Sequence, residues 1–252
     1  GRSRKRQLLL SELSLRPRTV VISFGTLMLS HLMPDKFKQS IRSLALAIPN
    51  VTFLWKYEKP EHNVAAGIPN LITHTWLPQT DLLRDHRLSA FISHGGAGSS
   101  YGSILAGVPS LVIPVMGDQM RNAEMMKRIG VGRILKRDDL AYPDRIVEAL
   151  RDVLENDKFR ERALNVAKMV ESQPQSVRER LVSHMEFMAR FGPLDQLSHA
   201  GREMSTVKFY NLDIFAVFVG GVLTAVGILI FIVLRVFRQF PFVVIRLKNK
   251  SE

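Results

Sequence analysis

The stretch that decides the fold contains Trp76-Leu77-Pro78-Gln79, then His94-Gly95-Gly96-Ala97-Gly98-Ser99, then Asp118-Gln119, each placed after an apolar run. An aromatic ring offers a stacking surface for a base, a glycine-rich loop before a helix admits a phosphate, and a carboxylate with an amide can bond sugar hydroxyls. The combination predicts a site that holds a nucleotide-sugar by its base, its pyrophosphate and its hexose.

Short β-branched runs alternate with stretches of helical apolar spacing. The predicted strands are Thr19–Ser23, Val51–Trp55, Asn70–His74, Ala90–Ser93 and Leu111–Pro114, and one of the helical patterns is Phe37, Ile41, Leu44 and Ile48. This alternation predicts an α/β fold with a Rossmann-like parallel sheet. Ligands bind beyond the carboxyl ends of such strands, so we expect the three motifs and Gly25-Thr26, which also follows a strand, to converge at one edge.

The loop that begins at His94 has a definite physical role. Its glycines let the backbone approach a phosphate, Ser99 is expected to cap a helix from about Ser100 to Ala106, and the helix start favours an anion. His94 adds a hydrogen bond or a positive charge. Taken alone, the loop also fits a strand-to-helix turn with a structural histidine, Trp76 fits a core position, and Asp118-Gln119 fits a solvated turn. The joint spacing decides for a binding site.

The same residues carry a family resemblance. The matching positions are Trp76-Leu77-Pro78-Gln79, Leu82-Leu83, Ala90–Gly96, Gly107-Val108-Pro109, Pro114, Asp118-Gln119 and Asn122-Ala123, with Ser23–Thr26 upstream and Phe191–Pro193 and Tyr210–Asp213 downstream. This pattern closely resembles the signature of the UDP-glycosyltransferases, specifically the animal UDP-glucuronosyltransferases. It covers about residues 19–240. It implies the C-terminal, donor-binding half of a GT-B glycosyltransferase, followed by a membrane anchor.

The resemblance implies a role for individual residues. Trp76 would stack on uracil, and Gln79 would bond the ribose or the base edge. Thr26 and His94 would contact the pyrophosphate. The full set of implied donor contacts is Gly25, Thr26, Trp76, Leu77, Gln79, His94, Gly96, Ser99, Asp118 and Gln119, of which Ser99 would donate from the helix start and Asp118 with Gln119 would bind sugar hydroxyls. The chain is expected to carry no catalytic residue, no metal ligand and no cofactor, with the UDP-sugar as donor substrate.

Two positions depart from the family pattern. The family usually has Glu eight residues after the loop histidine, where it holds the ribose hydroxyls, and this chain has Gly102. The family often has Asn four residues after that histidine, and this chain has Gly98. Losing a carboxylate that accepts two hydroxyl bonds costs on the order of 1–3 kcal/mol of binding free energy. We therefore expect donor binding to be weakened or altered.

The second strong signal is a stretch from Ile214 to Leu234 without a charged residue. As a helix it rises about 31 Å, enough for a bilayer core. Basic residues, beginning with Arg235, follow it almost without an acid, which places the tail in the cytosol and the preceding domain in the lumen. Lys250 and Lys248 stand third and fifth from the end, which looks like the dilysine retrieval signal of endoplasmic reticulum membrane proteins. A basic tail that binds anionic lipid is the alternative.

Composition excludes several classes of function. The net charge of +12 comes partly from a terminal cluster at Arg2–Arg6 and from the tail, and no basic stripe with interleaved aromatics is visible, so a nucleic-acid partner is not expected. The chain has no cysteine, which rules out disulfides, thiolate catalysis and cysteine-based metal sites. No helix pairs His with Glu or His at metal-ligand spacing.

The predicted organisation is a basic leader at 1–18, a UDP-sugar-binding domain at 19–156, a helical segment packed on it at 157–209, a transmembrane helix at 214–234 and a cytosolic tail at 235–252. One Rossmann-like half is visible where the family uses two. The resemblance implies that an absent N-terminal half supplies the acceptor pocket and the catalytic base. The expected function is transfer of a hexuronic acid or hexose from UDP to a small lipophilic acceptor. A truncated regulatory or split-enzyme subunit that pairs with related transferases is the alternative.

Overall fold

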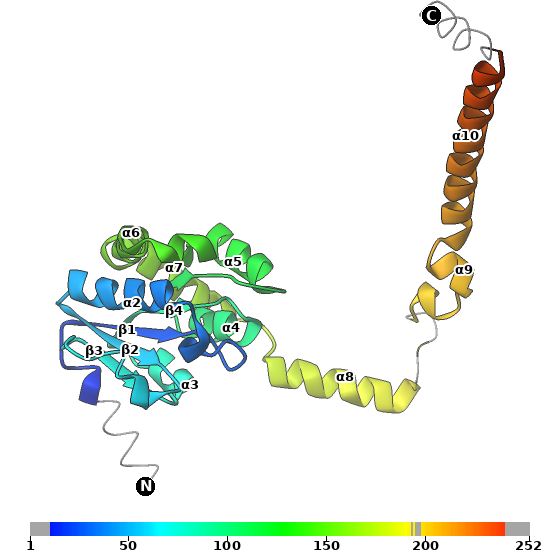
Figure 1. The fold of residues 1–252 in the computed structure, drawn as a ribbon. Helices are drawn as coiled ribbons and strands as arrows, with labels where there is room; N and C mark the ends of the chain where they lie inside the picture. The colour runs from blue at the N-terminus through cyan, green and yellow to red at the C-terminus, as the bar shows by residue number, and fades with distance from the viewer. Residues whose placement is uncertain (1–10, 193, 195–197, 240–252) are drawn as a thin grey trace, which may run out of the picture. The chain divides into compact units, whose positions relative to one another are not determined.

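The computed structural model describes residues 11–192, 194 and 198–239. The chain forms two compact units, and the boundary between them in the sequence lies between Pro174 and Gln175. The first unit is an α/β domain, and the second consists of helices (Figure 1). The uncharged stretch predicted to span a membrane falls in the second unit. The basic tail from residue 240 on, including Lys248 and Lys250, lies outside the described residues.

The α/β domain is built on one six-stranded sheet with the order β3-β2-β1-β4-β5-β6. Its strands are β1 Arg18–Ser23, β2 Val51–Lys56, β3 Leu71–His74, β4 Leu88–Ser93, β5 Ser110–Val112 and β6 Gly132–Ile134, and all neighbours run parallel. The strand order reverses between β1 and β4, which is the Rossmann topology and its switch point. The predicted parallel sheet is confirmed.

The strand β6 was not predicted. It is three residues long and its sequence, Gly132-Arg133-Ile134, lacks a β-branched run. Tertiary packing selects it, because a Cβ on Gly132 would lie 2.8 Å from the carbonyl oxygen of Ser110 on β5. Only glycine lets the two backbones approach this closely.

Helices cover both faces of the sheet because successive strand residues point to opposite sides. They are α2 Asp35–Ala47, α3 Gln79–Leu83, α4 Ala97–Leu105, α5 Gln119–Arg128, α6 Pro143–Glu155 and α7 Asp157–Glu171, with short 3-10 turns η1 Ser30–Leu32, η2 Pro60–His62 and η3 Arg137–Ala141. Val20 and Ile22 of β1 pack in one cluster with α2 and α6, whereas Val21 packs in another with α3. Figure 1 shows α2 and α3 on opposite sides of the sheet.

The helical pattern at residues 37–48 is confirmed by α2, whose Phe37, Ile41 and Leu44 are buried. The predicted segment 157–209 is divided between the two units. Helix α7 packs on α4 and α6 and buries Ala163, so it belongs to the sheet domain. The remainder of the segment, after Pro174, belongs to the second unit.

The described part of the predicted leader packs on the sheet domain. Leu13 is 2% exposed and joins the cluster under α3. Glu12 Oε2 lies 2.8 Å from Nε2 of His74, and Arg16 donates hydrogen bonds to two backbone carbonyls. The domain therefore begins before residue 19, because the buried Leu13 side chain and the polar contacts of Glu12 and Arg16 fix the segment in place. The cluster at Arg2–Arg6 lies outside the described residues.

The second unit contains α8 Val177–Phe191, the turn η5 Ala200–Arg202, α9 Thr206–Phe209 and α10 Leu212–Gln239. Helix α8 begins with a capping box between Ser176 and Glu179 and buries no side chain. Helix α10 contains the 27-residue stretch Leu212–Arg238, which rises about 40 Å and includes an 18-residue window with a mean hydropathy of 2.9. Within the described ranges, α10 alone is long and apolar enough to cross a membrane.

The packing of the segment before β1 gives a stability prediction. Leu13→Ala removes a buried side chain and should lower the free energy of unfolding of the sheet domain by about 2–4 kcal/mol. Urea unfolding followed by the fluorescence of Trp55, which is buried, measures the change. Leu15→Ala is the matched control, since Leu15 is 57% exposed and its truncation should change the stability by less than about 0.5 kcal/mol. Equal effects of the two substitutions would contradict a packed segment.

Candidate functional site

A cavity of about 540 Å³ opens at the carboxyl ends of the strands, and all of its lining residues belong to the sheet domain. Its walls come from the loops after β1, β3, β4 and β5, together with Lys56 at the end of β2. The predicted contacts that line it are Gly25, Thr26, Trp76, Leu77, Gln79, His94, Gly96, Ser99 and Gln119. The volume lies within the range of small-molecule and cofactor sites. The sequence motifs therefore converge at one edge, as predicted.

The loops after β1 and β4 meet at the switch point, where His94 fills the space between two glycines. A Cβ on Gly25 would lie 2.8 Å from Cε1 of His94, and a Cβ on Gly96 would lie 2.5 Å from its Nε2. Gly25 also has a φ of +86°, which disfavours other residues. The two glycines are therefore required for the imidazole to occupy this place.

Serines end both central strands and shape the loops that follow. Ser23 and Ser93 are register partners on β1 and β4. The Ser23 Oγ accepts a hydrogen bond from the Gly25 backbone N–H at 3.5 Å, and the Ser93 Oγ accepts one from the Gly95 N–H at 3.2 Å. Ser23 also lines the cavity. These two bonds turn the chain in the same way beside the switch point.

Helix α4 starts earlier than its sequence suggested. It begins at Ala97 with Gly96 as the N-cap, and no side chain caps it. Ser99 is therefore the third helical residue rather than the cap, and its hydroxyl accepts a hydrogen bond from Nε2 of Gln79 at 3.2 Å. The prediction of a Ser99 cap was wrong because the glycine loop itself takes the extended conformation before the helix. The uncapped helix start still faces the cavity with Gly96, Ala97 and Gly98.

The segment after β3 brings the aromatic ring of Trp76 and the amide of Gln79 to the cavity. Trp76 is 65% exposed, which excludes the alternative of a core side chain. Leu77 is 4% exposed and packs in the cluster with Leu82 and Leu83 of α3, so it anchors the segment. An exposed tryptophan between a buried leucine and a cavity is available as a stacking surface.

Asp118 and Gln119 lie differently with respect to the cavity. Gln119 is buried and lines it, and its Oε1 accepts hydrogen bonds from the backbone N–H groups of Val115 and Met116 at 2.9 and 3.0 Å. Asp118 is the exposed N-cap of α5 and does not line it. Asn122 donates to both Asp118 Oδ2 and the Gly95 carbonyl, at 2.8 and 2.9 Å. These bonds tie the α5 start to the His94 loop.

The protonation of His94 follows from its surroundings. Burial lowers the pKa of the imidazole below its ordinary value, and the charge of Lys56 lowers it further against the opposing effect of Asp118. The ring is therefore neutral at pH 7, so a hydrogen bond is favoured over a positive charge. Its Nδ1 is buried and has no hydrogen-bond partner in the part of the chain that the structure describes.

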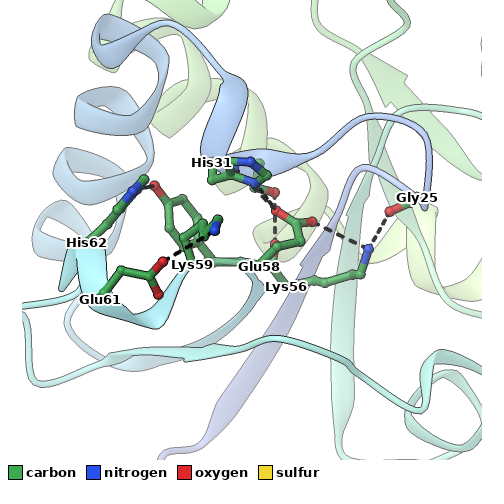
Figure 2. A network of polar contacts seen from close by, with 9 residues as sticks. Gly25, His31, Lys56, Glu58, Lys59, Glu61 and His62 are labelled. Carbon is green, nitrogen blue, oxygen red and sulfur yellow. Dashed lines mark hydrogen bonds and ion pairs between the residues drawn. The ribbon is translucent and has the colours of Figure 1, made fainter.

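Sequence reasoning missed Lys56 and Asp81, both of which line the cavity. Lys56 ends β2 and its Nζ donates a hydrogen bond to the Gly25 carbonyl at 2.6 Å. Figure 2 shows this bond and the neighbouring carboxylate of Glu58. The available signal was a lysine that closes the apolar run Val51–Trp55, directly at the carboxyl end of a strand.

The two positions that depart from the family pattern, Gly98 and Gly102, have different surroundings. Gly98 lines the cavity, and a Cβ there would have no atom within 4 Å. A Cβ on Gly102 would lie 3.2 Å from Cδ1 of Leu83, so this position faces α3 and not the lining of the cavity. Across the described ranges, no three His, Asp or Glu side chains gather closely enough to hold a metal ion.

The chain matches the family described as "UDP-glucoronosyl and UDP-glucosyl transferase" over residues 16–250. A putative UDP-glucuronosyltransferase of Caenorhabditis elegans, ugt-48, is 34% identical over 223 residues, which cover 86% of this chain and 41% of that protein. Human UDP-glucuronosyltransferase 2A3 is 29% identical over 207 residues, covering 82% of this chain and 38% of that protein. The chain thus spans about two fifths of the length of these relatives.

Solved glycosyltransferases share the fold. Os79 from O. sativa, in complex with UDP, has a TM-score of 0.60 at 21% identity, covering 72% of this chain and 42% of that one. A UDP-glucose: anthocyanidin 3-O-glucosyltransferase, also in complex with UDP, has a TM-score of 0.60 at 23% identity, covering 72% and 43%. The sheet domain therefore has the fold of the C-terminal half of a GT-B glycosyltransferase, and the chain belongs to the UDP-glucuronosyl and UDP-glucosyl transferase family.

Proposed function

We propose that this chain is the donor-binding part of a UDP-glucuronosyltransferase-like enzyme that transfers a hexuronic acid or hexose from a UDP-sugar to a small lipophilic acceptor. The observation that carries the proposal is the cavity at the strand ends, which nine of the ten predicted contact residues line. Its position at the topological switch point is where α/β sheets bind nucleotides. The UDP complexes of the fold relatives support the same donor.

The geometry supports one orientation of the UDP-sugar in the cavity. The uracil ring stacks on Trp76, which is exposed beside the cavity. The diphosphate lies at the start of α4, where backbone N–H groups and the neutral His94 ring donate hydrogen bonds. The hexose extends toward Gln119, whose Oε1 is taken by its own loop, so the Nε2 remains for a sugar hydroxyl. Asp118 joins it if the α5 start turns toward the sugar.

The reaction proceeds by attack of the acceptor hydroxyl on the anomeric carbon, with UDP as the leaving group and inversion at that carbon. The groups at the α4 start stabilise the charge that develops on the diphosphate. The acceptor pocket and the base that removes the hydroxyl proton come from an acceptor domain, either in the same protein or in a chain that pairs with this one. The relatives, which are longer, support the first arrangement.

The stacking of the base is tested with Trp76→Ala. Losing the aromatic surface should weaken UDP binding about 5- to 150-fold, because base stacking on an aromatic side chain contributes about 1–3 kcal/mol. Calorimetry with UDP on the detergent-solubilised chain measures the dissociation constant. Tyr142→Ala is the control, since Tyr142 is 59% exposed and does not line the cavity. Unchanged UDP affinity in Trp76→Ala, or no UDP binding by the unaltered chain, would contradict the proposed site.

The two departures from the family make separable predictions. Gly98→Asn adds an amide at the diphosphate end in open space and should tighten UDP binding about three- to tenfold, with little effect on uridine. Gly102→Glu should leave the affinities for UDP and uridine within about twofold of the unaltered chain, because position 102 faces Leu83 of α3 and not the cavity. Gly102→Ala is the matched control that strengthens the helix without adding a carboxylate. Unchanged UDP binding in Gly98→Asn, or tighter UDP binding in Gly102→Glu than in Gly102→Ala, would contradict these expectations.

We further propose that α10 anchors the chain in the endoplasmic reticulum membrane as a single pass, with the donor domain in the lumen and the tail in the cytosol. Arg235 and Arg238 lie at the C-terminal end of α10, and Asp213 lies at its start. Positive charge favours the cytosolic side. The retrieval signal at Lys248 and Lys250 is proposed from the sequence. We also propose that the chain forms homo- or hetero-oligomers with related transferases anchored in the same membrane.

The topology is tested by fusing a glycosylation acceptor to either end of the chain behind a cleavable signal peptide. The acceptor at the N-terminal end should be glycosylated and the one at the C-terminal end should not, because the basic flank holds the tail in the cytosol. Replacing Lys248 and Lys250 by serine should release the protein from the endoplasmic reticulum, followed by microscopy. A glycan at the C-terminal end, or unchanged retention of the double variant, would count against the proposal.

A further inference from the structure

Lys56 is a buried cation at the floor of the cavity. It is the last residue of β2, it is 7% exposed, and it lines the cavity beside the loops that follow β1 and β3. Its Nζ lies 5.7 Å from the centroid of the Trp76 ring and donates to the Gly25 carbonyl at 2.6 Å. The ammonium group therefore stands between the aromatic wall and the glycine loop.

A carboxylate holds this ammonium group in place. Oε1 of Glu58 lies 3.4 Å from the Lys56 Nζ, and Oε2 of the same carboxylate accepts from the His31 backbone N–H and lies 3.3 Å from the His31 ring (Figure 2). Although burial opposes it, hydrogen bonds from the backbone and from His31 hold the pKa of Glu58 below its ordinary value. Glu58 thus stays ionised and divides its charge between two partners.

The ammonium group has a donor left for a ligand. It carries three N–H bonds, and the described residues provide two acceptors, the Gly25 carbonyl and Glu58. To join β2 to the Gly25 carbonyl, an uncharged side chain with one hydrogen-bond donor would be sufficient. A buried charge is costly unless it is paired and fully hydrogen-bonded. A lysine at this place is therefore explained better by an anion in the cavity than by the loop contact alone.

We propose that Lys56 is the fixed positive charge of the donor site, binding an anionic oxygen of the UDP-sugar, and that Glu58 and His31 position its ammonium group. The inference rests on the proposed function and adds the residue that recognises the donor's charge. The oxygen belongs to the diphosphate or to the carboxylate of a hexuronic acid, and the two sources offer the same chemistry. His94 contributes hydrogen bonds to the same region, while Lys56 contributes the charge.

The experiment compares Lys56→Met with the unaltered chain by calorimetry, using UDP, uridine, UDP-glucose and UDP-glucuronate as probes. Loss of a charge-assisted hydrogen bond should weaken the binding of UDP-glucuronate, which carries both candidate oxygens, about 10- to 100-fold, whereas uridine, which has no anionic oxygen, should bind within about twofold of the unaltered chain. Equal losses for the three UDP compounds assign the contact to the diphosphate. A larger loss for UDP-glucuronate than for UDP-glucose assigns it to the hexuronate carboxylate.

Two further variants of Lys56 separate a loss of UDP binding from a loss of folding. Lys56→Gln keeps a donor for the Gly25 carbonyl without the charge, so it replaces the methionine variant if that one unfolds on heating earlier than the unaltered chain. Lys56→Arg keeps the charge and should retain UDP binding within about threefold of the unaltered chain. Lys38→Met is the matched control, because the Lys38 side chain is 15% exposed, pairs with Asp35 and does not line the cavity.

The results separate the inference from the function on which it rests. Unchanged affinity for both UDP and UDP-glucuronate in a folded Lys56→Gln chain, or a loss for uridine as large as the loss for UDP-glucuronate, would overturn the role of Lys56 while leaving the donor site in place. Failure of the unaltered chain to bind either UDP or uridine would overturn the proposed function and this inference with it.

Discussion

Between the ends of β1 and β4, the imidazole of His94 fills the space that a side chain on Gly25 or Gly96 would need. The strand order reverses between these two strands, and the cavity opens beside the loops that follow them. The glycines allow the loops to close on the histidine, and Ser23 and Ser93 fix the turns through their backbone bonds. The other walls of the cavity are positioned relative to this contact, including the α4 start and, through Asn122, the α5 start.

In this site, the positive charge and the neutral hydrogen-bonding group belong to different residues. His94 is buried enough to be neutral, so it can donate or accept without adding a charge. The positive charge lies instead on Lys56, whose ammonium group is held by the Gly25 carbonyl and by Glu58. Gly25 thus contacts both groups, through its Cα face to His94 and through its carbonyl to Lys56. A substitution at Gly25 is expected to disturb both.

The apolar helix α10 follows a different physical rule from the site. It is recognised by length and apolar composition alone, since 27 residues that include an 18-residue window with a mean hydropathy of 2.9 are long and apolar enough to cross a bilayer. Helix α8, by contrast, exposes Leu181, Met185 and Met188 although its apolar spacing is that of a packed helix.

The sequence by itself determined the parallel α/β fold, the position of each motif after a strand and the long apolar helix, because hydrophobic periodicity, glycine-rich loops and uncharged length are local properties. It also placed an aromatic, an amide and a histidine at strand ends, where topology alone brings them together. Only the tertiary structure decided the rest. The strand β6 exists because Gly132 lets it approach β5, Leu13 belongs to the core because the segment before β1 folds back, and Lys56 enters the site because β2 lies beside β1. These contacts join residues far apart in the chain, so no local sequence pattern predicts them.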